Sequence, residues 1–407
     1  MEALNSRPYT SAMSQLPEPI ELRIEQAAVD DLAARLWRTR WSPEIENSRW
    51  EYGANGAFLR DLAEYWQRGF DWRKQEMEIN RYAHFRLELA AGVPVHFILE
   101  RGKGPAPVPL ILTHGWPWTF WDWHRLIGPL TDPARHGGDP ADSFDVIVPS
   151  LPGYCLSTPL RRSGVTAPMV ADLWHNLMHD VLGYERFGAA GGDWGSFVTA
   201  ELGRRYRASM RGVYLSFPPL WHAGGVDNLR SEDYSAAEAG WLEKTRRKWQ
   251  TVVSHLTVHS RDHQTLAWAL NDSPVGLAAW LLERRRNWSD CSGDLYSRYT
   301  RDFLLTSVSL YWFTQSIASS MQLYAEEFRA GAIAGDSFLG SAPPERIETP
   351  TGIGVYPEEI ALLPRGLCEQ AANLVHWSVL PEGGHFAPAE TPDIYVGELR
   401  TFFRSLR

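Results

Sequence analysis

The chain has 407 residues, of which 44% are hydrophobic and 22% charged, and its formal net charge is -9. These proportions are ordinary for a globular protein, and the length predicts two or three structural units. The negative charge and the lack of a basic run argue against a nucleic acid as the ligand. No uninterrupted apolar stretch of about 18 residues is present, so we expect no membrane span.

The cysteines and the first residues suggest a compartment. Cys155, Cys291 and Cys368 are scattered and odd in number, which favours a reduced environment over a disulfide framework or a zinc ribbon. The segment Met1 to Pro19 is polar and carries no apolar signal. We therefore expect a cytoplasmic protein. The strong preference for arginine over lysine fits a GC-rich bacterial genome, and whether the chain forms a homodimer stays open.

The first hundred residues predict two helices and a hairpin. Apolar residues recur at helical spacing over 29–40 and 57–68, and they alternate over 85–100 around the turn Ala91-Gly92. The glycine-rich run 101–105 then leads into a different pattern. We predict an N-terminal arm that ends near residue 105.

A repeated pattern of strand, loop and helix begins at Val108. Apolar runs at 108–113, 144–149 and 186–192 predict strands, and 167–181 predicts a helix. Short apolar runs alternating with helices are typical of a mostly parallel sheet with helices on both faces.

A long helical segment rich in Trp and Arg interrupts this pattern. Strand-like runs resume at 352–356 and 374–380, and a C-terminal helix follows. We therefore predict an α/β fold in four parts, which are the N-terminal arm (1–105), the first part of the core (106–220), an inserted helical lid (221–335) and the second part of the core (336–407).

The run Gly191-Gly192-Asp193-Trp194-Gly195 has the form of a nucleophile elbow, with aspartate where esterases carry serine. An elbow holds its central residue on a strained turn from strand to helix, and the glycines relieve crowding of the backbone. A carboxylate in this position acts as a nucleophile that attacks a saturated carbon atom and displaces a leaving group from it. It opens an epoxide or expels a halide, and it leaves an ester on the enzyme.

An elbow nucleophile needs an acid and then a histidine further along the chain. His385 follows the last apolar run, and both Glu358 and Glu359 follow the run before it. The histidine would activate water and the acid would fix its tautomer.

The run His114-Gly115-Trp116-Pro117 follows a strand, as an oxyanion loop should. The backbone N–H groups of Trp116 and Trp194 would then bind the oxyanion that forms when water attacks the ester.

Together these motifs resemble the microsomal-type epoxide hydrolases, a branch of the α/β-hydrolase superfamily. The resemblance covers nearly the whole chain and implies an α/β-hydrolase fold, with Asp193 as nucleophile, His385 as base and Glu359 as acid. It implies no cofactor and no metal. Further matches, in chain order, are Arg40-Trp41-Ser42-Pro43, Trp50-Glu51-Tyr52-Gly53, Tyr65-Trp66, Phe70-Asp71-Trp72-Arg73, Pro152-Gly153-Tyr154, Asn271 to Leu277, Leu310-Tyr311-Trp312 and Gly383-Gly384-His385-Phe386.

The chain also departs from the family. The family places two lid tyrosines over the epoxide oxygen; one matches Tyr324, but this chain has His255 at the position of the other. Histidine can donate a hydrogen bond, so we expect the chemistry to survive with a changed pH dependence, or the substrate to differ. Trp118 lies where relatives have small residues, and we expect it to shape an aromatic-lined pocket with Trp121 and His114.

His255, His259 and His263 are spaced by four residues, which on a helix would align three zinc ligands. The residues between them are poor helix formers, and no acid that could activate a water is evident. We therefore predict no metal site, one lid histidine at the active site and two incidental ones.

The leading hypothesis is a cofactor-free epoxide hydrolase acting on a hydrophobic small molecule, aromatic or natural-product-like. Asp193 would form the ester, and water activated by His385 would release a vicinal diol. Two alternatives remain. One is a haloalkane dehalogenase with the same nucleophile, in which Trp194 would help to hold the halide. The other is a non-catalytic ligand-binding relative.

Overall fold

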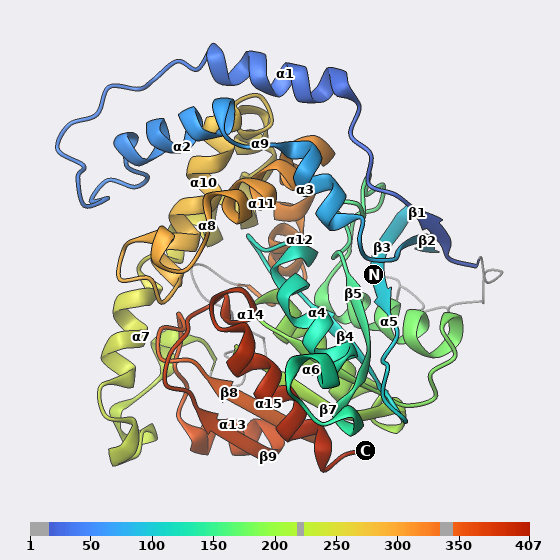
Figure 1. Cartoon of the computed structure of the whole chain (residues 1–407). Coiled ribbons are helices and arrows are strands. Elements are labelled where there is room, and N and C mark those ends of the chain that lie inside the picture. Colours follow the sequence, from blue (N-terminus) through green and yellow to red (C-terminus); the bar gives the residue numbers. More distant parts are fainter. Residues whose placement is uncertain (1–15, 218–223, 334–344) are drawn as a thin grey trace, which may run out of the picture.

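The computed structural model describes residues 16–217, 224–333 and 345–407 (Figure 1). The expectation for the polar segment Met1 to Pro19 lies for the most part outside these ranges. So do the expected boundaries between the core and the lid, at 220/221 and 335/336.

A sheet of nine strands within the described residues runs through the molecule, in the order β1-β2-β3-β5-β4-β6-β7-β8-β9. In this order the neighbours among β1, β2, β3 and β5 pair antiparallel, and the neighbours among β5, β4, β6, β7, β8 and β9 pair parallel. Predicted strands 108–113 and 144–149 coincide with β4 and β5, whereas the sequence did not indicate β1 or β7. The bounds are β1 Glu18–Ile20, β2 His84–Ala90, β3 Val93–Glu100, β4 Val108–Thr113, β5 Phe144–Pro149, β6 Phe187–Gly191, β7 Met210–Leu215, β8 Ile347–Val355 and β9 Ala372–Val379.

Helices cover both faces of the sheet. In β7, Gly212 lies against Phe402 of α15 (Pro392–Arg404), and the next residue, Val213, lies against Gly203 of α6 (Trp194–Arg205). Because successive residues of a strand point to opposite faces, α15 and α6 lie on opposite sides of the sheet. The other core helices are α4 His124–Thr131, α5 Ala167–His175, α13 Arg365–Ala371 and α14 Ala387–Glu390.

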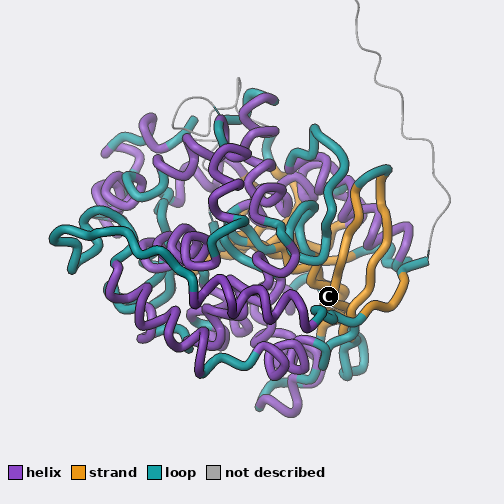
Figure 2. Tube along the Cα trace, turned by 90° about the horizontal axis from the view of Figure 1, so that it is seen from above, coloured by secondary structure: helices purple, strands orange, loops and turns teal. Residues whose placement is uncertain are grey.

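Residues 224–333, called the insertion below, lie between β7 and β8 in the chain and form helices with no strand among them. In Figure 1 these helices, coloured yellow to orange, lie above and to the left of strands β7 to β9, and Figure 2 shows the strands side by side in one group with helices around them. The helices are α7 Trp241–Trp249, α8 Val253–Arg261, α9 His263–Leu270, α10 Pro274–Trp288, α11 Arg301–Thr314 and α12 Ile317–Arg329. No helix in the described part of the chain is long and apolar enough to cross a membrane.

The N-terminal helices pack on the insertion. Helices α1 (Gln26–Trp37) and α2 (Gly56–Arg68) both contact α10, and α3 (Trp72–Ile79) contacts α11. An ion pair joins the Arg35 guanidinium to the Asp272 carboxylate at 2.7 Å, beside the start of α10. The N-terminal helices therefore cover the insertion and stabilise it through these contacts.

Two buried histidines on neighbouring strands form one hydrogen-bond chain. His84 Nε2 lies 2.9 Å from the carbonyl oxygen of Ile79, so this nitrogen carries the proton and Nδ1 accepts from His96 Nε2 at 2.9 Å. His96 Nδ1 accepts in turn from the Ser150 hydroxyl. Every ring nitrogen in this series of hydrogen bonds already has a partner, so neither ring has a site for a further proton. Burial also lowers the pKa of both rings, and both are therefore neutral.

Acid should weaken the fold through this pair. The pKa of each ring is lowered in the folded chain, so near pH 6.5 the unfolded chain binds protons that the folded chain does not. The stability is fully present above that pH. It is lost as the pH falls below it, at up to about 1.4 kcal/mol per pH unit for each ring. Urea denaturation at several pH values between about 7.5 and 5 measures the loss.

Other histidines titrate over the same range, so the variant His96→Gln serves as the comparison. Its free energy of unfolding should depend on pH less steeply than that of the unmodified protein, by about one proton. Equal slopes would show that the pair does not titrate as described.

Candidate active site

Loops from five strand ends meet at one edge of the sheet. Trp116 follows β4, Tyr154 follows β5, Asp193 follows β6, Glu359 follows β8 and His385 follows β9. Ligands of open α/β sheets bind beyond the carboxyl ends of the strands, so this edge is where a site is expected.

Asp193 occupies a strained turn between β6 and α6. Its backbone has φ 51° and ψ -129°, a left-handed conformation that is unusual for a residue with a side chain. A Cβ atom at Gly195 would lie 1.9 Å from the carbonyl oxygen of Thr113, so only glycine allows the elbow to approach the end of β4 this closely. The carboxylate is thereby presented at the strand ends, as in a nucleophile elbow.

The two oxygens of the Asp193 carboxylate have different partners. Oδ1 accepts the backbone N–H of Trp116 at 2.7 Å, and Oδ2 lies 3.2 Å from Nε2 of His385. The loop after β4 can approach because residue 115 is glycine, whose Cβ would lie 2.3 Å from the Asp193 Cβ. One oxygen is therefore held in the oxyanion loop, and the other faces the imidazole.

His385 is held between two carboxylates. Its Nδ1 lies 2.6 Å from Oε1 of Glu359, and both side chains are buried. Burial alone would lower the pKa of His385, but the charge of Glu359 and the hydrogen bonds to Asp193 and Glu359 outweigh it and raise the pKa to about 9.

The structure separates the two candidate acids, although they are adjacent in sequence. Glu358 forms ion pairs with Lys244 and Lys248 of α7 and does not contact the imidazole. Only Glu359 is brought against His385.

Tyr324 projects from α12 toward the elbow. Its ring lies perpendicular to that of Trp194 at 4.8 Å and to that of Trp116 at 6.1 Å. Burial, together with the negative charge of Asp193, raises the pKa of this phenol well above its ordinary value. Tyr324 therefore remains a hydrogen-bond donor at neutral pH.

Two histidines of α8 pack against Trp116 and Tyr324 beside the elbow. The His255 ring is stacked on that of Trp116 at 5.3 Å, with 7° between the planes, and the His259 ring lies edge-on to it at 4.4 Å. Burial lowers the pKa of both histidines far enough to keep them neutral. His259 was expected to be incidental, but its ring also lies 4.9 Å from that of Tyr324, so it belongs to the site.

The third histidine of the spaced set, His263, begins a new helix, α9. The residues around His255 and His259 do form a helix, contrary to their weak propensity. In residues 16–217, 224–333 and 345–407, no three His, Cys, Asp or Glu side chains lie where they could hold a metal ion together.

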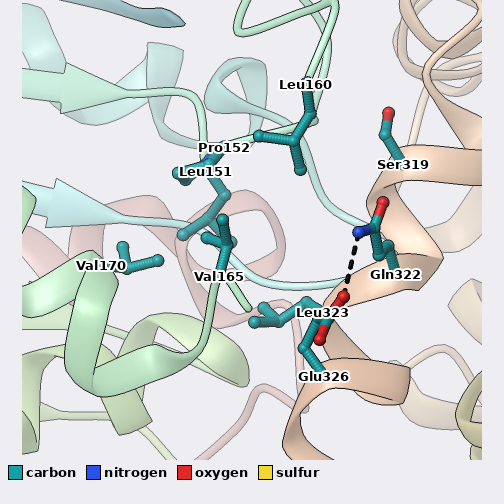
Figure 3. A pocket seen from close by; sticks show the side chains of 9 residues that line it. All are labelled: Leu151, Pro152, Leu160, Val165, Val170, Ser319, Gln322, Leu323 and Glu326. Atoms are coloured by element: carbon teal, nitrogen blue, oxygen red, sulfur yellow. Dashed lines mark hydrogen bonds between the residues drawn. The ribbon is translucent and has the colours of Figure 1, made fainter. Parts of the chain in front are cut away.

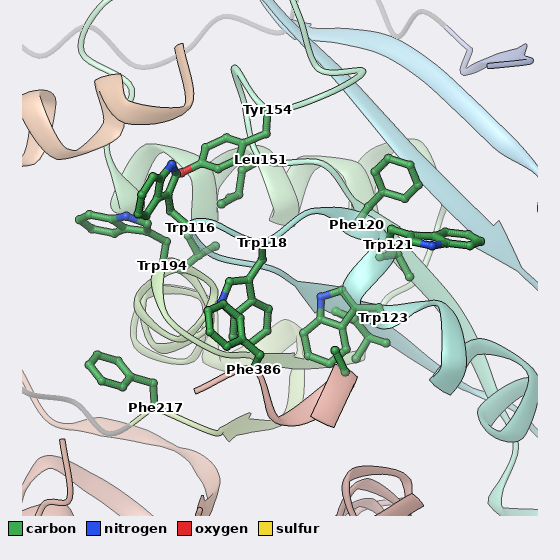
Figure 4. Close-up of a cluster of buried hydrophobic side chains, with 14 of the residues drawn as sticks. Trp116, Trp118, Phe120, Trp121, Trp123, Leu151, Tyr154, Trp194, Phe217 and Phe386 are labelled. Carbon is green, nitrogen blue, oxygen red and sulfur yellow. The ribbon is translucent and has the colours of Figure 1, made fainter. Parts of the chain in front are cut away.

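The structure divides the three residues that were expected to line the pocket. Trp118 packs perpendicular to the His385 ring at 5.7 Å and so supports this imidazole. Trp121 is not brought into this group, because its ring stacks on that of His124 at 4.2 Å; Figure 4 shows it apart from Trp116 and Trp194. His114 uses both ring nitrogens, with the Gly115 carbonyl and the Leu151 amide as partners, and thus fixes the oxyanion loop.

A very small, mainly apolar pocket lies between α12 and the segment after β5 (Figure 3). Its polar side chains are on α12, where Gln322 donates to Glu326 at 3.1 Å. The wall consists of Leu151, Pro152, Leu160, Val165, Val170, Ser319, Gln322, Leu323 and Glu326.

Sequence reasoning gave no role to Tyr154, which it noted only within a matching motif. The signal available was its position after the strand end of β5, beside the loops that carry the other groups.

Comparison with known proteins agrees with this geometry. A model of the α/β-hydrolase fold matches residues 108–259, and a model of the epoxide hydrolase N terminus matches residues 17–123. Epoxide hydrolase 1 of Sus scrofa is 31% identical over 418 aligned residues, covering 98% of this chain and 90% of its own. A Stigmatella aurantiaca protein named as a candidate epoxide hydrolase is 36% identical, covering 96% and 85%. The crystal structure of juvenile hormone epoxide hydrolase from Bombyx mori superposes with a TM-score of 0.83 at 27% identity, covering 96% and 95%.

Fold and site thus define an α/β-hydrolase with an aspartate at the elbow. Within that class the chain belongs to the epoxide hydrolase family, whose members are enzymes. The expected family and fold are confirmed.

The raised pKa of His385 should depend on the Asp193 carboxylate. In the variant Asp193→Asn one of the two negative neighbours is lost, so the pKa of His385 should fall from about 9 toward its ordinary value near 6.5. Nuclear magnetic resonance of labelled histidine across a pH series measures it. Glu358→Gln is the matched control and should leave the titration unchanged, because Glu358 pairs with lysines; an unchanged pKa in Asp193→Asn would contradict the description.

Proposed function

We propose that the protein opens a hydrophobic epoxide to a vicinal diol through a covalent ester on Asp193. One observation carries the proposal. An elbow carboxylate is bonded by one oxygen to the Trp116 amide and faces, by the other, an imidazole that is itself paired with Glu359. This arrangement suits a carboxylate nucleophile followed by hydrolysis of its ester.

In the first step Oδ2 of Asp193 attacks an epoxide carbon, because Oδ1 is already engaged by the Trp116 amide. The carbon–oxygen bond of the ring breaks, and the oxygen needs a donor. Tyr324 supplies one, since its raised pKa keeps the phenol protonated.

His255 supplies another donor in place of the family's second tyrosine. It is neutral, and the buried Nδ1 atom of its ring has no hydrogen-bond partner in the structure. Stacking on Trp116 would hold the ring flat while the substrate binds.

In the second step His385 takes a proton from water, which attacks the ester carbonyl. Alkylation has by then removed the negative charge of Asp193, one of the two charges that raise the pKa of His385, so the imidazole more readily loses its own proton and can act as a base. The amides of Trp116 and Trp194 would bind the oxyanion, and Glu359 would stabilise the imidazolium.

The surroundings support a hydrophobic substrate, aromatic or natural-product-like. The aromatic rings of Trp116, Trp194 and Tyr324 lie around the nucleophile, where apolar and aromatic groups of a substrate would pack. In this proposal the insertion acts as a lid that excludes water during ring opening.

The variant His385→Gln should trap the intermediate. Ester formation needs Asp193, whereas hydrolysis needs the base, so turnover should fall by about 10²- to 10⁴-fold and an adduct should accumulate. Intact mass after mixing with styrene oxide and a panel of alkyl and aryl epoxides should show one added epoxide, and peptide mapping should place it on Asp193.

The double variant Asp193→Asn/His385→Gln is the control and should gain no mass. Labelling by chloro- or bromoalkanes with loss of halide, and none by epoxides, would instead support a dehalogenase. Reversible binding of the epoxides, without turnover in the unmodified protein, would support a non-catalytic relative.

A further inference from the structure

Tyr154 is a fully buried tyrosine in the loop after β5. Its hydroxyl has no hydrogen-bond partner in the structure. The backbone on either side is turned into the left-handed region, with φ 83° at Gly153 and 43° at Cys155. The hydroxyl of Ser319, on α12, donates to the Gly153 carbonyl at 2.5 Å. The loop is therefore fixed to the helix that carries Tyr324.

The Tyr154 ring points toward the nucleophile. It packs against the His114 ring at 5.1 Å, next to the oxyanion loop. Figure 4 shows its hydroxyl end directed toward Trp116 and Trp194. The backbone N–H of Trp116 donates to the Asp193 carboxylate, and Trp194 directly follows Asp193 in the chain, so the hydroxyl is directed toward two residues that adjoin this carboxylate.

The electrostatic surroundings agree with this placement. Burial and then the negative charge of Asp193 raise the pKa of Tyr154 well above its ordinary value, as they do for Tyr324. Both phenols therefore keep their protons, and both respond to the same carboxylate.

An unpartnered buried hydroxyl destabilises a folded protein, so its presence needs an explanation. The neighbouring Tyr311 shows the ordinary solution, because its hydroxyl donates to the Trp118 carbonyl at 2.7 Å. Tyr154 lacks such an acceptor, and its hydroxyl end is directed toward Trp116 and Trp194. Donors fixed in advance toward developing charge are how active sites stabilise it.

We propose that Tyr154 is a further catalytic residue, whose phenol donates to the epoxide oxygen together with Tyr324. The inference rests on the proposed function. As the Asp193 Oδ2–carbon bond forms, the carbon–oxygen bond of the ring breaks and its electron pair goes to the oxygen, which takes a proton from a phenol. Hydrolysis of the ester releases one proton from water, which returns to the phenolate, so the sum is epoxide plus water giving diol.

The proposal gives this chain two phenols although the second lid position holds His255. One phenol comes from the insertion and the other from the core. His255, at the second lid position, then adds a further donor beside the two phenols, from a ring that is stacked on Trp116.

The test compares rates of ester formation in the His385→Gln background, where hydrolysis does not obscure the first step. Adduct formation with styrene oxide is followed by intact mass over time. Tyr154→Phe should slow it by about 100-fold, the lower end of the range for loss of a positioned proton donor, because Tyr324 remains. The midpoint of thermal unfolding should stay the same or rise, because only an unpartnered hydroxyl is removed.

Tyr311→Phe is the matched control, since it removes a buried hydroxyl of the same cluster that is already bonded, and it should leave the rate of adduct formation within about twofold. An unchanged rate in Tyr154→Phe, or equal slowing by Tyr311→Phe, overturns the proposal. If His385→Gln itself forms no adduct, the proposed function fails first, so the two failures are distinguishable.

A second variant keeps the ring and the hydroxyl. Site-specific replacement of Tyr154 by 3,5-difluorotyrosine lowers the pKa of the phenol, so ester formation in the same background should lose rate at a lower pH than with tyrosine. A pH profile that does not move contradicts donation by this residue.

Discussion

A carboxylate held between an amide and an imidazole is the interaction on which the rest of the site depends. Asp193 sits in a left-handed backbone conformation, with one oxygen on the Trp116 N–H and the other facing His385. Strain of this kind persists only where the surroundings over-determine the geometry. Glycines at 115 and 195 allow that approach, and Glu359 fixes the imidazole from behind. Each partner comes from a different strand end, so the sheet has to form before the site exists.

A buried ion pair joins the insertion to the loop after β4. Arg285 of α10 pairs with Asp122, just after the oxyanion loop, at 2.6 Å, and its guanidinium lies 4.1 Å from the centre of the Phe386 ring. Both charged side chains are buried, so loss of either one would leave the other uncompensated, at a cost of about 3–5 kcal/mol. The same helix layer brings Tyr324, His255 and the N-terminal helices into place. The placement of these side chains and the stability of the fold therefore depend on the same contacts.

Much of this organisation could be predicted from local patterns. Continuous apolar runs marked β4 and β5 because both strands are buried on both faces. β7 was missed because Arg211 and Gly212 interrupt its run, although neighbouring strands bury it. Residue type and strand position alone do not separate Glu358 from Glu359, and only the family resemblance favoured Glu359. In the structure Glu358 is held by lysines more than a hundred residues away in the chain. The four-residue spacing places His259 on the same helix face as His255, and Tyr154 follows a strand end, but their contacts with Trp116 and His114 arise from the packing of distant segments.

The central claim is that water attacks an ester on Asp193 and not the epoxide itself. A single turnover in water labelled with ¹⁸O, with the enzyme in excess over an epoxide that it converts, tests this directly. The account predicts that the heavy oxygen enters the Asp193 carboxylate, found by mass spectrometry of its peptide, and that the diol from this first turnover carries none. Heavy oxygen in the diol together with an unlabelled Asp193 peptide would contradict it.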